Sequence, residues 1–92
     1  MIRSFKCGYT EALSKGHRVK KFVNIGKVAR RKLRQLEIAN CLEDLRVPPG
    51  NHLEVLKGSR AGQYGIRIND QWRICFHWLN GFAENVEIVD YH

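Results

Sequence analysis

Residues 63–89 read QYGIRINDQWRICFHWLNGFAENVEIV, and this stretch decides the fold. Apolar and polar side chains alternate along it, as is typical of strands that bury one face. Its apolar positions are Tyr64, Ile66, Ile68, Trp72, Ile74, Phe76, Trp78, Val86 and Ile88. Two hairpin signals, Asn69-Asp70 and Asn80-Gly81, interrupt the alternation. The sequence therefore predicts three antiparallel strands, over residues 63–69, 72–78 and 83–89.

The register of these strands follows from their apolar positions, because a slip of one residue would expose a whole apolar face. Pairing Ile66 with Ile74 places Arg67 opposite Arg73, on the face from which Tyr91 also projects. The other predicted pairs are Ile68 with Trp72, Ile74 with Ile88, Phe76 with Val86, and Arg73 with Val89. Two directly opposed arginines repel each other. An anion between them would explain that cost, and the alternative is that both point into water.

Upstream of the sheet, residues 24–42 carry the clearest helical signal, with apolar side chains at three- and four-residue steps. Asn24 is a suitable N-cap for this helix. Residues 2–6 fit a short strand, and residues 9–14 fit a short helix that ends at Gly16. The sequence thus predicts an α+β fold, with an N-terminal strand and two helices packed on a small antiparallel sheet.

The chain has 92 residues, which predicts a single domain over residues 1–92. Its net charge of +7 is unevenly distributed, since residues 12–36 hold nine Lys or Arg and no acid. A one-sided basic field attracts polyanions. We expect contact with nucleic acid or the ribosome, and a merely solvated cationic face is the alternative. The residues expected to make that contact are Lys27, Arg30, Arg31 and Arg34.

Cysteines, histidines and hydropathy exclude several other classes of protein. Cys7, Cys41 and Cys75 form no Cys-x-x-Cys pair, which fits reduced thiols, and Cys75 lies in an aromatic run typical of a core. The four histidines are scattered, so we expect no metal and no other cofactor. The sequence lacks the apolar run of a signal peptide or membrane span. We expect a cytoplasmic protein without membrane contact.

The closing residues Asp90-Tyr91-His92 follow the last strand and can all take part in proton transfer. RNA can be cut without a metal when its 2′-hydroxyl attacks the neighbouring phosphate. That reaction needs a base, an acid, and cations for the charge that accumulates on phosphorus. We expect His92 to act as the acid, because imidazole titrates near neutrality and the terminal carboxylate favours its protonated form. Asp90 is a candidate to orient a histidine or bind an RNA hydroxyl, with a surface acid as the alternative. Tyr91 is a candidate to stack on a base or donate a proton, with edge-strand packing as the alternative.

The remaining candidates are cations for phosphate and a base for the 2′-hydroxyl. Guanidinium groups grip phosphate oxygens in pairs and keep their charge, which suits Arg73 and Arg67 to that role. Lys57, just before the sheet, is a further phosphate-binding candidate. His52 and Glu54 precede it, and either is a candidate base. For Lys57 the alternative is simple solvation, and for His52 it is a half-buried loop histidine without a catalytic role.

Three segments, LEVLKG at 53–58, IRINDQWRI at 66–74 and the closing DYH, make the chain resemble the HigB branch of the RelE toxin superfamily. The resemblance extends over nearly the whole chain. It implies a RelE-like fold and a bacterial toxin that enters the ribosomal A site of the 70S ribosome and cuts messenger RNA there. It also implies a small helix-turn-helix antitoxin of the HigA kind, which reaches operator DNA together with the toxin as a complex.

The resemblance also assigns roles to residues. It places the family's strand arginine on Arg73, its phosphate-binding lysine on Lys57, and its C-terminal trio on residues 90–92, while Arg67 matches a basic strand position of the superfamily. One position departs, because a histidine of that branch is replaced by Glu54. Either Glu54 is the base, or the out-of-register His52 is, or the enzyme is weakened.

Two other functions remain open from the sequence. A toxin of the same fold can act without catalysis by binding a target protein, as the gyrase-directed ParE branch does. A basic RNA-binding module without toxicity is the third reading. Only the enzyme needs the proton-transfer groups of Tyr91 and His92.

Overall fold

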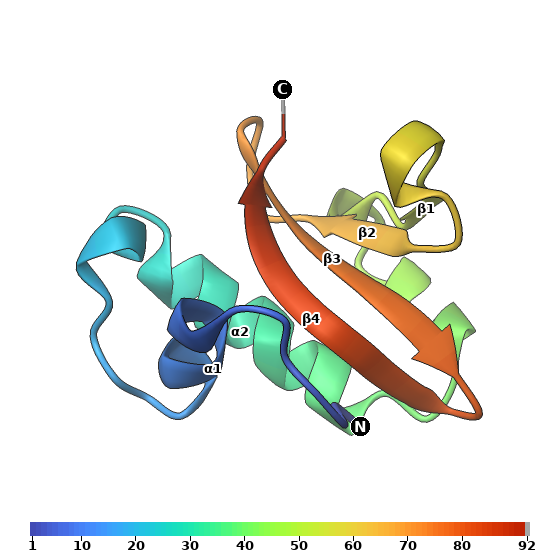
Figure 1. Ribbon diagram of the computed structural model, residues 1–92, viewed down its shortest axis with the longest axis horizontal. Helices are drawn as coiled ribbons and strands as arrows, with labels where there is room; N and C mark the ends of the chain where they lie inside the picture. Colours follow the sequence, from blue (N-terminus) through green and yellow to red (C-terminus); the bar gives the residue numbers. More distant parts are fainter. Residues whose placement is uncertain (92) are drawn as a thin grey trace.

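The computed structural model describes residues 1–91, which form one four-stranded antiparallel sheet with helices packed beside it (Figure 1). The α+β architecture predicted from the sequence is confirmed. Along the sheet, the strands are β1 (Glu54–Val55), β2 (Tyr64–Arg67), β3 (Trp72–Leu79) and β4 (Phe82–Asp90). The helices are α1 (Gly8–Ser14), α2 (Gly26–Ile38) and the short 3₁₀ helices Lys20–Phe22, Leu42–Arg46, Pro49–Asn51 and Gly58–Arg60. None of the described helices is long and apolar enough to cross a membrane.

The register of the sheet is the one that the apolar alternation predicts. Ile66 pairs with Ile74, and Arg67 lies directly opposite Arg73. The sheet departs from the prediction in β4, where a bulge interrupts the pairing with β3. Asn85, with a φ of 54°, lies in that bulge. The predicted pair of Phe76 with Val86 falls at this irregularity and is absent from the regular ladder.

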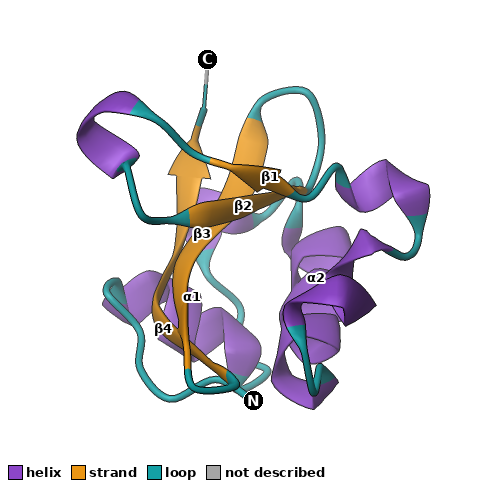
Figure 2. Cartoon of the chain, turned by 90° about the vertical axis from the view of Figure 1, so that its right-hand side faces the viewer, coloured by secondary structure: helices purple, strands orange, loops and turns teal. Residues whose placement is uncertain are grey.

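The core lies between the inner face of the sheet and α2, which runs along that face (Figure 2). The helix contributes its apolar stripe, and the strands contribute the alternate residues predicted to face inward. The fully buried members include Leu33 and Leu36 from α2, and Ile66, Ile74 and Phe76 from the strands. Burying a large apolar side chain contributes about 1.5–3 kcal/mol, so this interface supplies most of the stability that holds the sheet in place.

The predicted strand at residues 2–6 forms only two isolated parallel bridges to β4, Ile2 with Ala83 and Phe5 with Val86. The bulge explains the shortfall, because the N–H of Asn85 is satisfied by the hydroxyl of Ser4 at 2.9 Å instead of a ladder bond. The segment runs along the β4 edge of the sheet (Figure 1).

The predicted bounds of the long helix are wrong at both ends. The residue before the helix is Ile25, which makes no side-chain cap, so Asn24 is not the N-cap. At the other end Ala39 is extended, and the carboxylate of Asp44 accepts the N–H groups of Asn40 and Cys41 at 2.9 and 3.3 Å. These backbone hydrogen bonds hold the pKa of Asp44 below its usual value.

A buried polar network ties the loop that follows α2 back onto that helix. Lys32 is buried and its Nζ donates to Oδ1 of Asn51. The amide of Asn51 donates in turn to the carbonyl of Leu45 at 3.0 Å and to Gln35 Oε1 at 3.1 Å. Burial lowers the pKa of Lys32, with a further contribution from the neighbouring Arg31. This network fixes the chain immediately before β1 and therefore helps to position the edge strand of the sheet.

Candidate functional site

The outer face of the sheet, which points away from α2, carries the arginines predicted to bind phosphate. Arg67 on β2 and Arg73 on β3 lie directly opposite each other. Val89 of β4 is the partner of Arg73 on its other side, and Tyr91 follows on the same face by alternation. The predicted gathering of Arg67, Arg73 and Tyr91 is therefore the one that the structure shows.

Arg73 is held by two neighbours that come from opposite edges of the sheet. Its Nη1 lies 3.1 Å from Oε1 of Glu54 on β1, and its Cζ lies 5.0 Å from the centre of the Tyr91 ring. The side chain of Arg73 is only 21% exposed. Its Nη1 is buried, and among residues 1–91 no group accepts a hydrogen bond from it. A buried guanidinium nitrogen with an unused donor favours an acceptor from outside the chain.

Arg67 has a carboxylate partner of its own, Asp70, three residues later in the turn between β2 and β3. The side chain of Asp70 is almost fully exposed. An ion pair in water of this kind contributes little to stability. The two opposed arginines therefore each face a carboxylate, which offsets their mutual repulsion in the free protein.

Asp90 and Tyr91 point to opposite faces of the sheet. Asp90 pairs with Trp72, so alternation points its side chain away from the face of Arg73. Its Oδ2 accepts a hydrogen bond from Gln71 Nε2 at 3.0 Å. The backbone N–H of Tyr91 donates to the carbonyl of Gln71 at 2.7 Å, which anchors Tyr91 beside Arg73. His92 lies outside the described residues.

Lys57 and His52 lie on exposed segments that flank β1. Lys57 is exposed and immediately precedes the 3₁₀ helix Gly58–Arg60. His52 is exposed, with a φ of 46°, and lies between the 3₁₀ helix Pro49–Asn51 and β1. Of the two candidate bases, Glu54 and not His52 is therefore the one that the structure brings to Arg73.

An apolar plug closes the centre of the outer face. Leu56 is buried and rests on Gly65, where an added Cβ would lie 3.3 Å from Leu56 Cδ2. Cys75, the residue opposite Gly65, is fully buried. Cys75 was expected in the core, and it is buried, but on the outer face of the sheet. Burial raises the pKa of its thiol to about 11.

A second charged cluster lies beyond the plug. Glu87, the partner of Cys75 on β4, pairs with Arg60 at 3.2 Å and with Lys6 at 3.6 Å. Sequence reasoning missed this cluster, and it also missed β1 and the anchoring role of Gln71. The only signal for β1 was the spacing that sets Glu54 and Leu56 on one face, which is too short to identify a strand.

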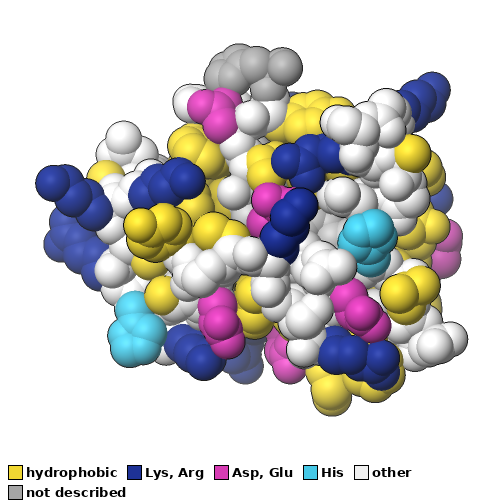
Figure 3. Space-filling model, in the orientation of Figure 1, with side chains coloured by type: hydrophobic (Ala, Val, Ile, Leu, Met, Phe, Trp, Pro, Cys, Tyr) yellow, Lys and Arg dark blue, Asp and Glu magenta, His cyan; other side chains and the backbone are white. Residues whose placement is uncertain are grey.

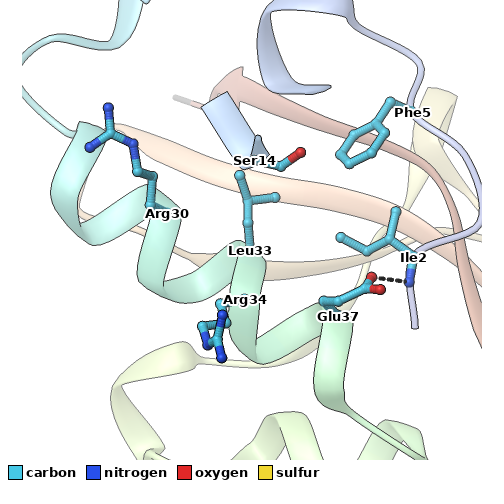
Figure 4. Close-up of a pocket in the computed structure, with 7 residues that line it drawn as sticks. All are labelled: Ile2, Phe5, Ser14, Arg30, Leu33, Arg34 and Glu37. Carbon is cyan, nitrogen blue, oxygen red and sulfur yellow. Dashed lines mark hydrogen bonds between the residues drawn. The ribbon is translucent and has the colours of Figure 1, made fainter. Parts of the chain in front are cut away.

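The basic residues predicted to bind the ribosome lie on α2, on the exposed side. Lys27, Arg30, Arg31 and Arg34 are all exposed. Arg30 and Arg34 border a cleft of about 370 Å³ between α2 and the N-terminal segment (Figure 4). At one end of the molecule Lys and Arg side chains gather over the segment that joins α1 to α2 (Figure 3). The cationic surface is thus separate from the outer face of the sheet.

The part of the chain that the structure describes holds no cluster of metal-ligating side chains. Within residues 1–91, no three His, Cys, Asp or Glu side chains lie close enough together to hold a metal ion. The chemical groups that converge on the outer face are instead a guanidinium pair, a carboxylate and a phenol.

Comparison with solved structures defines the class of fold. The chain is similar to YafQ from Escherichia coli, with a TM-score of 0.61, 15% identity, and coverage of 98% of this chain and 93% of that one. It is also similar to a chain of the YoeB–YefM complex from Staphylococcus aureus, with a TM-score of 0.58, 18% identity, and coverage of 100% of this chain and 98% of that one. The helices and antiparallel sheet described above therefore form the fold that YafQ and YoeB share.

The family follows from sequence. Residues 8–92 match the family described as the RelE-like toxin of type II toxin-antitoxin system HigB, and the chain belongs to that family. Toxin HigB-1 of Vibrio cholerae is 47% identical over 55 residues, which are 60% of this chain and 58% of that protein. Endoribonuclease HigB of Proteus vulgaris is 42% identical over 40 residues, 44% of each chain. The matched stretch is thus less than two thirds of the length of either relative.

Proposed function

We propose that this chain is a ribosome-dependent endoribonuclease toxin, which cuts messenger RNA in the A site by metal-independent attack of the 2′-hydroxyl. One observation carries the proposal: Arg73 presents a buried, unsatisfied guanidinium nitrogen beside Tyr91 and directly opposite Arg67. Guanidinium groups at that spacing suit the oxygens of a phosphate. Membership of the HigB family and the endoribonuclease named among its relatives support the same reaction.

In this reaction Arg73 and Arg67 hold the phosphate and stabilise the charge that develops on phosphorus. The 2′-oxygen forms a bond to phosphorus while the bond to the 5′-oxygen breaks. Glu54 accepts the proton of the 2′-hydroxyl, and His92 gives a proton to the departing 5′-oxygen. Tyr91 stacks beside the reacting phosphate. Lys57 adds a cation at the rim.

Asp90 takes a supporting role in this proposal, because its side chain points to the opposite face from Arg73. Its hydrogen bond with Gln71 holds the end of β4 to the turn before β3. Since Gln71 also binds the backbone of Tyr91, this contact fixes the direction in which the closing residues leave the sheet. Asp90 is thus a positioning residue for Tyr91 and His92.

The proposal includes two macromolecular partners. The exposed basic side chains of α2 contact ribosomal RNA of the 70S ribosome, which carries the phosphates they attract. A helix-turn-helix antitoxin of the HigA kind neutralises the toxin in the cytoplasm, and operator DNA is bound only through their complex. The similarity to YoeB in a complex with YefM supports a protein antitoxin.

The test is cleavage of a defined messenger RNA on programmed 70S ribosomes. We expect Arg73→Ala to cut about 10²–10³-fold more slowly than wild type, since it removes a fixed donor to the developing charge. Arg46→Ala is the matched control, because Arg46 is an exposed arginine paired with Glu43 on a distant 3₁₀ helix. It should cut like wild type.

Two results would contradict the proposal. Intact messenger RNA with wild type would reject the endoribonuclease and make inhibition of DNA gyrase the next assay. Equal cleavage by Arg73→Ala and wild type would instead reject the outer face of the sheet as the reaction site.

A further inference from the structure

The position beside Arg73 that a phosphate would need already holds a negative charge. Glu54 Oε1 lies 3.1 Å from Arg73 Nη1, the nitrogen that lacks a hydrogen-bond acceptor among residues 1–91. We infer that the Glu54 carboxylate occupies the phosphate-binding position of Arg73 in the free protein, and that the RNA phosphate binds by displacing it. This inference rests on the proposed function of Arg73.

Arg73 has further neighbours besides Glu54. Val89 lies beside it on β4, the ring of Tyr91 stacks 5.0 Å from its Cζ, and Arg67 faces it from β2. The Tyr91 ring therefore lies against the guanidinium, and the carboxylate of Glu54 lies at its Nη1. An incoming phosphate and the Glu54 carboxylate compete for the same donors.

Glu54 is placed so that it can leave without disturbing the sheet. It belongs to the two-residue edge strand β1, whose backbone pairs with Gly65 and Tyr64 of β2. Its side chain is 44% exposed, about twice as exposed as that of Arg73. Water can therefore receive the displaced carboxylate, and only side-chain torsions have to change.

The contact geometry also fits an exchangeable pair. Glu54 and Arg73 approach within ion-pair distance, but the buried Nη1 makes no hydrogen bond to the carboxylate. A pair that lacks the aligned hydrogen bond has less to lose on separation than a bidentate one. A phosphate with three accessible oxygens can supply the missing acceptor, so the exchange gains a hydrogen bond.

Displacement would link binding to chemistry. While Glu54 faces Arg73, its negative charge is compensated and its oxygens point at the guanidinium. Once the phosphate takes that place, the carboxylate is released beside the bound nucleotide, where the 2′-hydroxyl must lose its proton. Removing the carboxylate should therefore strengthen binding and weaken turnover, two effects that a purely structural residue would not combine.

The test measures affinity for a fluorescein-labelled oligodeoxynucleotide, which has phosphates but no 2′-hydroxyl and cannot be cut. Fluorescence anisotropy at low salt compares wild type with Glu54→Gln, which keeps the shape of the side chain and removes its charge. We expect Glu54→Gln to bind about 3- to 10-fold more tightly, because a half-exposed competing charge is lost.

Glu11→Gln is the matched control for net charge. The side chain of Glu11, on α1, is 46% exposed and pairs with Lys15 just after the helix. It should change affinity by less than 2-fold, an amount about that expected for one remote charge in a screened solvent. A double variant with Arg73→Ala should abolish the gain of Glu54→Gln, because the two substitutions act on one contact.

The outcomes separate this inference from the proposed function. Cleavage on programmed ribosomes should show both KM and kcat reduced for Glu54→Gln. Equal or weaker oligonucleotide binding by Glu54→Gln, including no binding by either protein, overturns the displacement. A gain that persists in the Arg73→Ala background also overturns it. Failure of wild type to cut messenger RNA rejects the proposed function, whereas the oligonucleotide result judges the displacement.

Discussion

The two faces of the sheet are built from alternate residues of the same strands, yet they differ in almost every physical property. The inner face is a continuous apolar surface whose members, such as Ile74 and Phe76, are fully buried against α2. The outer face holds opposed arginines, carboxylates and a buried thiol around a small apolar plug. Stability is thus concentrated on one side, and an unsatisfied guanidinium nitrogen of Arg73 is tolerated on the other.

This division shows how a small domain can keep an energetically poor site. A chain of this size is stabilised by only about 5–10 kcal/mol in total. The two opposed arginines and the unsatisfied hydrogen-bond donor of Arg73 each cost a fraction of this free energy. Because the inner face and α2 hold the strands in register by themselves, the outer face is free to present groups arranged for a ligand.

The largest effect should come from the inner face. Phe76→Ala removes a fully buried ring, and we expect it to lower the free energy of unfolding by about 3–5 kcal/mol, measured by urea denaturation. His77→Ala, at the next position and half-buried, should cost less than about 1 kcal/mol. Comparable losses at both positions would break the distinction between the faces.

The next effect concerns the thiol under the outer plug. The pKa of Cys75 is raised from 9.0 to about 11 by burial, so the folded state holds its proton more tightly than the unfolded state. The stabilisation that this thiol contributes to folding is fully present below about pH 9. It is lost as pH rises through 11, and the free energy of unfolding then falls by on the order of 2 kcal/mol.

Cys75→Ala tests this pH dependence. As pH rises from 8 to 11, the unfolding free energy of wild type should fall relative to that of Cys75→Ala. Urea titrations at several pH values measure this difference. The other titrating groups cancel in that difference. A difference independent of pH would show that the thiol is open to water, and that the plug does not seal the outer face.

The smallest effect should come from the glycine beneath the plug. Gly65→Ala places a Cβ 3.3 Å from Leu56 Cδ2, so Leu56 must move by a few tenths of an ångström. We expect a loss of about 1 kcal/mol in thermal or urea unfolding. Gly50→Ala is the control, because a Cβ there meets nothing within 4 Å. No difference between the two variants would mean that Leu56 packs loosely and that the outer face lacks a fixed centre.

Alternation in the sequence was enough to predict the strongest feature of the site. The inward positions Ile66 and Ile74 allow only one register, and that register carries Arg67 to its place opposite Arg73. Side-chain period and burial decide this pairing locally, so no tertiary information was needed. The opposed arginines are therefore predictable from sequence, and so is the position of Tyr91.

The rest depends on contacts that a linear pattern does not encode. β1 has only two residues and both are exposed, so no apolar period marks it. The partnership of Glu54 with Arg73 exists only because β1 pairs with β2. Likewise, the apolar stripe of α2 continues into Ala39, which is buried although the helix has ended. The apolar stripe predicted correctly that Ala39 is buried. Because burial continues past the end of the helix, the helix bounds predicted from the stripe were wrong.

The bridges between the N-terminal segment and β4 have a consequence for the order of folding. Ser4 and Asn85 are joined by a hydrogen bond although they are 81 positions apart in the chain. Contacts of such separation slow folding, because a long loop must close before they form. During synthesis, the bridges of Ile2 and Phe5 must wait until β4 has been made, although the N–H of Ile2 also has a partner in Glu37 of α2. The site is completed late, because Tyr91 follows β4, and a partly synthesised chain carries the basic helix before it carries a complete site.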